Sequence, residues 1–412
     1  MLNRIIIFVM LIFMLFTQYA GVPLHGMTLN VAFAYHETGY SLYSSMEHEG
    51  SETIGTPAEP TATASPSASP AEPAPNSSPV PDAEPEASGP PLVPSPDETP
   101  FPQPPEIPDP ESSESEEPSL LGPLTDHLPS FDETSPKAVQ FIKDMEDIIN
   151  NAVKKSGIKT TYGIFIMDLG EKLYYGINEN LTRTDPADNI TEGYFNSASV
   201  IKLFQGYLLC DMIRRGELDD EKVYFDRVTG RKFKLLPMIK HMISYSDNNY
   251  SNACLRLVGN KKSNEVLGRL GINNSRIYGE MSGAIGYSRQ NNIEKYGTDK
   301  RCARITPLDA GLILYNVYLN KYTDPYMKVL NEGLLGNVYN TRIPVGVKRV
   351  SSKYYIAHKT GTNSALGVYN DAGIVYTKRP FILAAFAQGT TSNTGHSFIR
   401  SLAEQLTRYF EN

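Results

Sequence analysis

The sequence has no tryptophan and only three cysteines among its 412 residues. Three cysteines are too few for a disulfide framework. Cys210 and Cys254 lie in apolar stretches of helical pattern, and we expect both to be buried thiols that only pack. The seven histidines are scattered, and no His-Glu-x-x-His motif or Cys/His cluster is present. This absence disfavours a metalloenzyme, so we expect neither a metal nor a cofactor.

The N-terminus has the pattern of an export signal. Arg4 precedes an unbroken apolar run, Ile5–Phe16, and Ala32-Phe33-Ala34 supplies a small-x-small cleavage site. We therefore predict that residues 1–34 are a signal peptide or, if the leader is retained, a membrane anchor. The protein is then exported, and it contacts the membrane only through this segment.

A second region, residues 35–136, is predicted to be a disordered linker. It is rich in Pro, Ser and Glu, and from about Ser51 onward very few of its residues are large and apolar. Such a composition cannot bury enough surface to offset the entropy lost on ordering. The remaining residues, 137–412, have the length and composition of one globular domain.

Basic residues are missing from the first third of the chain. No Lys or Arg occurs between Arg4 and Lys137, whereas residues 1–136 contain 20 acidic side chains. The rest of the chain holds 37 basic and 26 acidic side chains, a formal net charge of +11. A basic exported domain suits anionic wall polymers or small anionic substrates, and export makes nucleic acid an improbable partner.

The pattern of residues 137–412 predicts strands at both ends and helices between them. We expect amphipathic helices over 137–155 and 397–410, because apolar residues recur there at spacings of three and four. Strands are expected at 160–168, 172–175, 356–358, 372–376 and 381–387. The strands at the two ends must meet in one mostly antiparallel sheet, flanked by the terminal helices. Residues 197–319, which are mainly helical, form a second lobe, so the fold class is α/β of the α+β type.

Three short motifs occur in one order along this domain. They are Ser199-Val200-Ile201-Lys202, Ser246-Asp247-Asn248 and Lys359-Thr360-Gly361. The first motif alone is weak evidence, since Ser156-Gly157-Ile158-Lys159 has the same spacing by chance. The ordered set is strong evidence when its members fall on a helix, a loop and a strand. No Gly-x-Ser-x-Gly elbow is present, which disfavours a Ser-His-Asp hydrolase.

This ordered trio resembles that of the class A β-lactamases and penicillin-binding serine hydrolases, and the resemblance covers essentially all of residues 137–412. It implies a β-lactamase/transpeptidase-like fold with Ser199 as nucleophile. Residues three apart on a helix share a face, so Lys202 lies beside the Ser199 hydroxyl and acts as its base if its pKa is depressed.

The other motif residues have roles that follow from their chemistry and from the resemblance. Ser246 relays a proton to the leaving nitrogen, and Asn248 binds a substrate amide. Lys359 and Thr360 bind a substrate carboxylate, and Gly361 lets the ligand approach the strand. The resemblance also places an oxyanion hole at the backbone N–H groups of Ser199 and Thr362.

The chain departs from the class A pattern in three places. The stretch between Ser199 and Ser246 is short, which suggests a trimmed helical lobe. His358 precedes Lys359, where class A enzymes usually have Asp. In class A enzymes a loop Glu, followed four residues later by Asn, activates the water that releases the acyl group. Glu280 is the candidate here, but Ala284 stands at the Asn position.

Three functions share the expected fold and stay open. The first is a serine β-lactamase that opens β-lactam rings through a Ser199 acyl-enzyme. The second is a penicillin-binding D,D-peptidase, or another wall amidase or esterase, that is acylated by peptidoglycan stem peptides and released slowly. The third is a wall-side module that only binds or senses β-lactams or peptidoglycan.

Overall fold

The computed structural model describes residues 29–36, 39–46, 122–185, 190–297 and 302–412. Most of the predicted leader and linker therefore lies outside the described residues. Strands β1 (Leu29–His36) and β2 (Gly39–Met46) pair as an antiparallel hairpin, which belongs to a unit separate from the main domain. Residues 39–46 were expected to be disordered linker. They form a strand because they combine aromatic and alternating apolar residues, and the proline-rich composition begins only beyond them.

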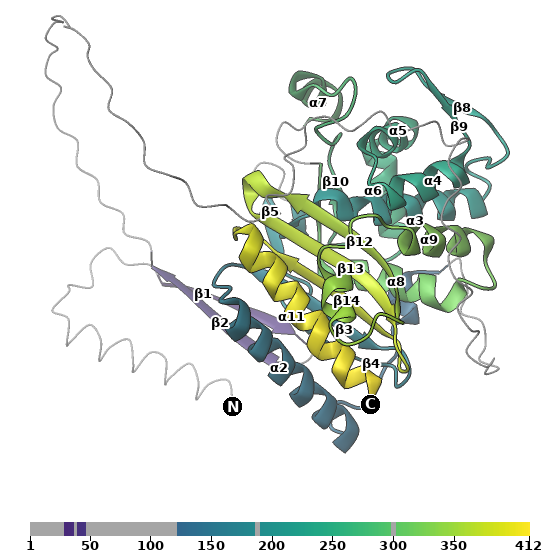
Figure 1. Cartoon of the computed structure of the whole chain (residues 1–412). Helices are drawn as coiled ribbons and strands as arrows, with labels where there is room; N and C mark the ends of the chain where they lie inside the picture. Colours follow the sequence, from purple (N-terminus) through teal and green to yellow (C-terminus); the bar gives the residue numbers. More distant parts are fainter. Residues whose placement is uncertain (1–28, 37–38, 47–121, 186–189, 298–301) are drawn as a thin grey trace, which may run out of the picture. The chain divides into compact units, whose positions relative to one another are not determined.

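The main domain is built on one five-stranded antiparallel sheet with the strand order β12-β13-β14-β3-β4. Its strands are β3 (Tyr162–Asp168), β4 (Leu173–Ile177), β12 (Tyr355–Asn363), β13 (Val368–Tyr376) and β14 (Phe381–Ala387). Strand β14, near the end of the chain, pairs with β3, near the start of the domain, over seven residues each. The predicted meeting of the two ends in one sheet is thus confirmed (Figure 1).

Two long helices, α2 (Pro136–Ser156) and α11 (Ser392–Glu411), cover one face of this sheet (Figure 1). They pack against each other and, with α10 (Ile343–Lys348), enclose an apolar core. Local rules explain the bounds of α2. The Ser135 side chain caps its first turn, Pro136 occupies the first helical position, and Gly157 ends it in the left-handed conformation.

Helix α8 (Pro307–Asn320) contacts strands β3, β13 and β14, and with its neighbours it forms the second lobe. The other helices are α3 (Ile201–Arg214), α4 (Leu235–Ser244), α5 (Asn248–Val258), α6 (Asn260–Arg269), α7 (Arg289–Tyr296) and α9 (Pro325–Leu335). Short strands connect them: β5 (Thr182–Asp185), β6 (Ile190–Gly193), β7 (Phe195–Asn196), β8 (Tyr224–Asp226), β9 (Arg231–Phe233), β10 (Arg276–Ile277) and β11 (Ala303–Ile305). The predicted helical lobe is confirmed.

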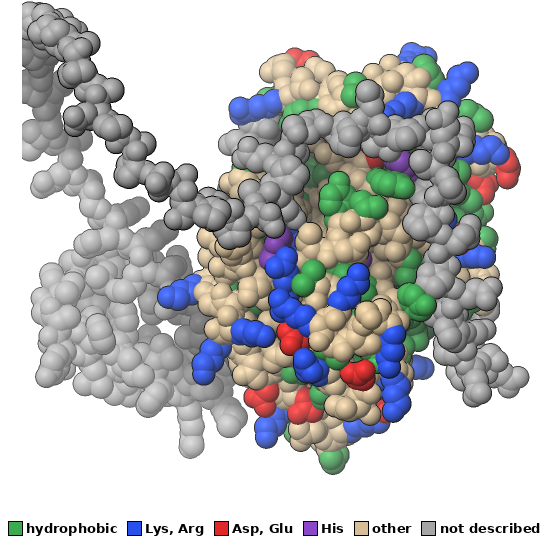
Figure 2. Space-filling view, viewed as in Figure 1, with side chains coloured by type: hydrophobic (Ala, Val, Ile, Leu, Met, Phe, Trp, Pro, Cys, Tyr) green, Lys and Arg blue, Asp and Glu red, His purple; other side chains and the backbone are tan. Residues whose placement is uncertain are grey.

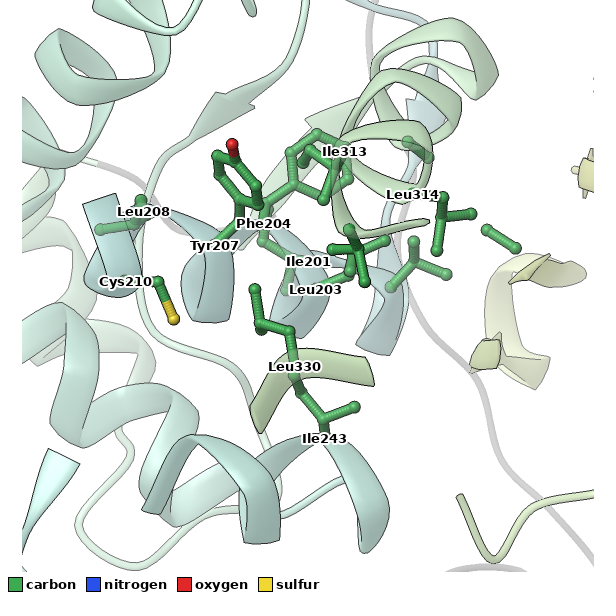
Figure 3. Packing of buried hydrophobic residues seen from close by; sticks show 14 of the residues in the cluster. Ile201, Leu203, Phe204, Tyr207, Leu208, Cys210, Ile243, Ile313, Leu314 and Leu330 are labelled. Carbon is green, nitrogen blue, oxygen red and sulfur yellow. The ribbon is translucent and has the colours of Figure 1, made fainter. Parts of the chain in front are cut away.

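Helix α3 lies at the centre of the helical lobe. Every residue from 201 to 213 is buried, because the helix is apolar on nearly all its faces and is surrounded by other helices. Figure 3 shows Phe204, Tyr207 and Leu208 of α3 among side chains from three other helices, including Ile243 and Leu330. As predicted, Cys210 and Cys254 are buried free thiols. A polar side chain on the first turn of α3 is therefore surrounded by protein.

The folded domain begins before Lys137, the predicted boundary. A 3-10 helix, η1 (Leu124–His127), lies against the helical lobe, and Leu124 is only 2% exposed. The Leu124 N–H donates to Leu270 O at 2.8 Å, and His127 Nδ1 lies 2.9 Å from Asn316 Nδ2. The composition of the linker gives no sign of this ordered segment, because a single buried leucine and backbone hydrogen bonds hold it against the domain.

Lys and Arg side chains are spread over the face seen in Figure 2, with acidic side chains among them. Glu404 on α11, for example, pairs with Lys155, Arg349 and Arg408. Within the part of the chain that is described, no helix combines the length and the apolar character needed to cross a membrane.

Candidate active site

Ser199 lies in a single 3-10 turn, η2 (Ala198–Val200), that leads directly into α3. Ala198 has a φ of 41°, in the left-handed region that residues other than glycine rarely adopt. Asn196 fixes this turn, because its side-chain oxygen accepts a hydrogen bond from Ala198 N at 3.0 Å. Asn370 of β13 in turn donates to Asn196 O at 2.8 Å. Strain of this kind is held only by well-packed surroundings and concentrates at functional sites.

Lys202 is fully buried on the first turn of α3. Its Nζ lies 2.8 Å from Ser199 Oγ and 2.8 Å from Asn248 Oδ1. Burial lowers the pKa of Lys202 from 10.5 to about 7, and the negative charges that Cys302 and Asp247 carry when ionised offset this only in part. A neutral amine at this distance can accept the hydroxyl proton.

The second serine, Ser246, also has a left-handed backbone, with a φ of 56°. The fully buried Lys359 of β12 donates to Ser246 Oγ at 3.1 Å and to Thr360 O at 3.0 Å. Burial, followed by the charge of Lys202, lowers the pKa of Lys359 well below its usual range. Two buried lysine amines thus lie in one region, and a positive charge on either of them disfavours a positive charge on the other.

Asp247 positions the third residue of the loop motif. It caps α5, accepting hydrogen bonds from Asn249 N at 2.7 Å and Tyr250 N at 3.3 Å. Asn248 is therefore held at the first turn, where it contacts Lys202 and donates through Nδ2 to Ser282 O at 2.9 Å. The Ser246-Asp247-Asn248 motif thus spans a loop and the start of α5.

Strand β12 lies directly against the turn that holds Ser199. A Cβ added at Gly361 would lie 2.7 Å from Ser197 O and 3.0 Å from Val200 Cγ2, so this contact requires glycine. Thr360 is buried, and Thr362, two residues further along the strand, is exposed. The structure thus brings Ser199, Lys202, Ser246, Asn248 and Lys359 into one cluster, with Thr360–Thr362 along its edge.

Glu280 does not join this cluster. Its Oε2 accepts from Arg256 Nη1 at 3.0 Å, and its Oε1 accepts from Tyr296 OH at 3.2 Å. The next residue, Met281, is the one that faces the site, with its Sδ 3.3 Å from Lys202 Nζ. Asn252 fixes this arrangement by bonding the backbone of Met281 at both N–H and C=O.

His358, the second departure from the class A pattern, is a buried residue of β12. Its Nδ1 lies 2.9 Å from Asp371 Oδ1 and its Nε2 lies 3.2 Å from Asn340 Oδ1. Burial alone would raise the pKa of Asp371, but His358 and then Arg342 lower it. His358 therefore has a buried carboxylate partner that supports the strand carrying Lys359.

The sequence did not predict two residues of the site, Met281 and Arg342. Met281 lies in a loop without periodicity, and nothing in its neighbourhood distinguishes it from Glu280. Arg342 is 1% exposed, and its Nη2 donates to Thr362 Oγ1 at 2.5 Å. A basic residue is ordinarily expected at the surface, so sequence alone gives no reason to place Arg342 inside. In the described residues no group of three or more His, Cys, Asp or Glu side chains is placed to hold a metal.

Comparisons with known proteins agree with this fold. The model of the β-lactamase enzyme family (Beta-lactamase2) matches residues 144–410. A β-lactamase from Xanthomonas campestris pv. campestris shares the fold, with a TM-score of 0.51, 18% identity, and coverage of 64% of this chain and 96% of that one. A protein named PBP-A has a TM-score of 0.52 at 18% identity, with coverage of 65% and 96%. A β-lactamase from Sphaerobacter thermophilus has a TM-score of 0.51 at 18% identity, with coverage of 65% and 97%. No curated protein matches the sequence.

Proposed function

Since this chain belongs to the β-lactamase enzyme family, we propose that it is a serine hydrolase in which β-lactams and related cyclic amides acylate Ser199. The observation that carries the proposal is the 2.8 Å contact between Ser199 Oγ and a fully buried Lys202 amine. A pure binding module has no need to hold a lysine where its pKa falls to about 7. This pairing favours covalent chemistry over binding alone.

The proposed acylation moves one proton at each end of the reaction. Ser199 Oγ attacks the carbonyl carbon while its proton passes to Lys202 Nζ, and the carbonyl oxygen becomes an oxyanion. The C–N bond then breaks, and the leaving nitrogen takes a proton through Ser246 Oγ, which Lys359 contacts at 3.1 Å. Ser246 is reprotonated by the Lys202 ammonium, so the proton taken from Ser199 ends on the leaving nitrogen and Lys202 is neutral again. The backbone N–H groups of Ser199 and Thr362 are the proposed donors to the oxyanion.

Substrate carboxylate and amide groups have partners at the same site. Lys359, Thr360 and Thr362 lie along the strand that faces the Ser199 turn, and a substrate carboxylate would favour the charged form of the buried Lys359. Asn248 is the proposed partner of a substrate amide. A peptidoglycan stem peptide, which also ends in a carboxylate, is the alternative substrate of the proposal.

The contacts of Glu280 and Met281 favour slow release of the acyl group. Class A enzymes release it with a glutamate near the lysine, whereas here a thioether contacts Lys202 and the Glu280 carboxylate is bound by Arg256. We therefore propose a penicillin-binding type of turnover, with a persistent acyl-enzyme, ahead of a fast β-lactamase. D,D-peptidase, amidase and esterase activities fall in this class.

Export and a position at the cell wall are part of the proposal. They rest on the apolar run after Arg4, which lies outside the described residues, and on the basic character of residues 137–412. Anionic wall polymers are the partners that such a charge would attract.

Mass spectrometry of the full chain mixed with a penicillin, followed over time, tests the proposal. We expect one adduct on Ser199 that persists for many minutes. An adduct that disappears within seconds as penicillin is consumed would instead mean a working β-lactamase. The absence of any adduct on folded protein would contradict acylation by β-lactams.

A matched pair of variants tests which loop residue controls release. Met281→Glu places a carboxylate beside Lys202 and should shorten the lifetime of the adduct. Glu280→Gln should leave that lifetime unchanged, because Glu280 faces Arg256 and Tyr296. The reverse pattern, in which Glu280→Gln traps the adduct and Met281→Glu does nothing, would make Glu280 the releasing base.

A further inference from the structure

A second cavity lies on the other side of the loop that carries Glu280. Its volume is about 390 Å³, and it is partly open to solvent. Its walls come from the segment after β8, from α5, from the 280–286 loop and from α7. Its lining includes Val228, Arg256, Glu280, Glu294, Lys295 and Tyr296.

The backbone around Glu280 separates this cavity from the Ser199 site. Asn292 bonds Glu280 at both its N–H and its C=O, and Asn252 does the same for Met281. With both peptide units pinned, the side chain of Glu280 faces the cavity and that of Met281 faces Lys202. A ligand in the cavity would therefore meet Glu280 without entering the cluster around Ser199.

The cavity contains charges of both signs in nearly equal measure. Arg256 is held in place by Asp226, through Nε at 2.9 Å and Nη2 at 2.8 Å, and its Nη1 bonds Glu280. The side chains of Arg256 and Glu280 are 10% and 11% exposed, so each still reaches the cavity surface. Glu294 and Lys295, both exposed on α7, add one more charge of each sign.

From this arrangement we propose that the cavity binds a small zwitterion, an amino acid or a short peptide with free amino and carboxylate ends. The carboxylate binds between Arg256 and Lys295, and the ammonium group binds between Glu280 and Glu294. Arg256 and Glu280 already pair with each other, so a simple anion at Arg256 would lie near the Glu280 carboxylate and a simple cation at Glu280 would lie near the Arg256 guanidinium. A ligand with both charges can place each of its ends against the group of opposite charge and so balances this repulsion.

The size and the remaining walls suit such a ligand. A cavity of about 390 Å³ is at the small end of the range for ligand sites. Val228 lies against Gly286, where a larger residue would collide, and together they supply a short apolar wall. The Tyr296 hydroxyl, already bonded to Glu280, lines the cavity beside the proposed ammonium position.

Isothermal titration calorimetry of the full chain tests this site. The ligands are L-alanine, D-alanine and alanyl-alanine. N-acetylalanine lacks the ammonium group and alaninamide lacks the carboxylate, so they are matched controls. We expect saturable binding of a zwitterion, and binding of each control to be weaker by about tenfold or more. No saturable binding, or equal binding of the zwitterion and both controls, would overturn the proposal.

Three variants locate the binding. Val228→Phe fills the cavity and should weaken binding about tenfold or more, whereas Val223→Phe, an exposed residue outside the cavity, should change it less than twofold. Ser199→Ala should bind the zwitterion like the parent protein, because the cavity is separate from the nucleophile. Loss of binding in Ser199→Ala, or no effect of Val228→Phe, would place the ligand elsewhere and refute this site.

Discussion

Two segments of this protein share the pattern Ser-x-x-Lys, and the structure gives them opposite properties. Ser156 stands at the last turn of α2, where its hydroxyl bonds Ala152 O at 2.8 Å within the helix. Gly157, with a φ of 68°, ends the helix there, and Lys159 is exposed. The pattern therefore brings no amine to the Ser156 hydroxyl.

The second segment begins a helix instead of ending one. Ser199 and Lys202 share a continuous helical turn, and α3 continues from that turn into the core of the lobe. Burial then separates the two lysines further, because Lys159 is exposed whereas burial lowers the pKa of Lys202 to about 7. A spacing of three makes a nucleophile–base pair only when the helix continues through it and protein surrounds the lysine.

The largest expected effect comes from removing the two hydroxyls in turn. Ser199→Ala should abolish the penicillin adduct, since no other group replaces the attacking oxygen. Ser156→Ala, its matched control, should keep the adduct and its rate. Intact-protein mass spectrometry measures the penicillin adduct of each variant. Full activity of Ser199→Ala would contradict the assignment of Ser199 as the nucleophile.

The next comparison removes the two amines. Lys202→Ala should slow acylation by about 10²–10⁴-fold, the usual contribution of a general base. Lys159→Ala should leave the rate unchanged, because the Lys159 side chain is exposed and its helix has ended. Stopped-flow acylation measures each rate, and a mild effect at Lys202 would mean that another group takes the proton.

A smaller effect follows from pH. The pKa of Lys202 is lowered to about 7, so its neutral, basic form dominates above that pH and is lost as the pH falls. The acylation rate should therefore rise with pH through about 7 and fall about tenfold per pH unit below it. A pH–rate profile that is flat from pH 5 to 9 would argue against Lys202 as the base.

The smallest effect concerns the two positive backbone angles near these serines. Gly157→Ala, at a φ of 68°, should lower the free energy of unfolding by about 1 kcal/mol and leave acylation unchanged. Ala198→Gly, at a φ of 41°, relieves strain but loosens the nucleophile turn, so we expect unchanged or higher stability with slower acylation. Chemical denaturation and acylation kinetics together separate the two cases, and faster acylation by Ala198→Gly would contradict a positioning role for the strained turn.

The sequence was most informative where local rules govern the chain. The helix over 137–155, capped by Ser135-Pro136 and ended by Gly157, lies within one residue of α2 at each end. The strands at both ends of the domain and the ordered motifs also predicted the sheet and the cluster around Ser199. These features depend on neighbouring residues or on a pattern repeated along one element.

The sequence failed where a single long-range contact decides the outcome. Glu280 and Met281 are adjacent, and only the hydrogen bonds from Asn252 and Asn292 determine which of them faces Lys202. Leu124, within the predicted linker, is part of the fold because Leu270 accepts its backbone N–H. Neither contact leaves a periodic signal.

The sequence by itself thus determined the class of fold and pointed to the proposed nucleophile and its proposed base, because apolar periodicity and motif order depend on nearby residues. Only the tertiary structure decided that Lys202 is buried enough to be basic, that Met281 rather than Glu280 lies beside it, and that Arg342 is inside the domain. Burial and the direction of a side chain depend on atoms from distant parts of the chain. Those atoms come together only when the sheet and the helical lobe have packed.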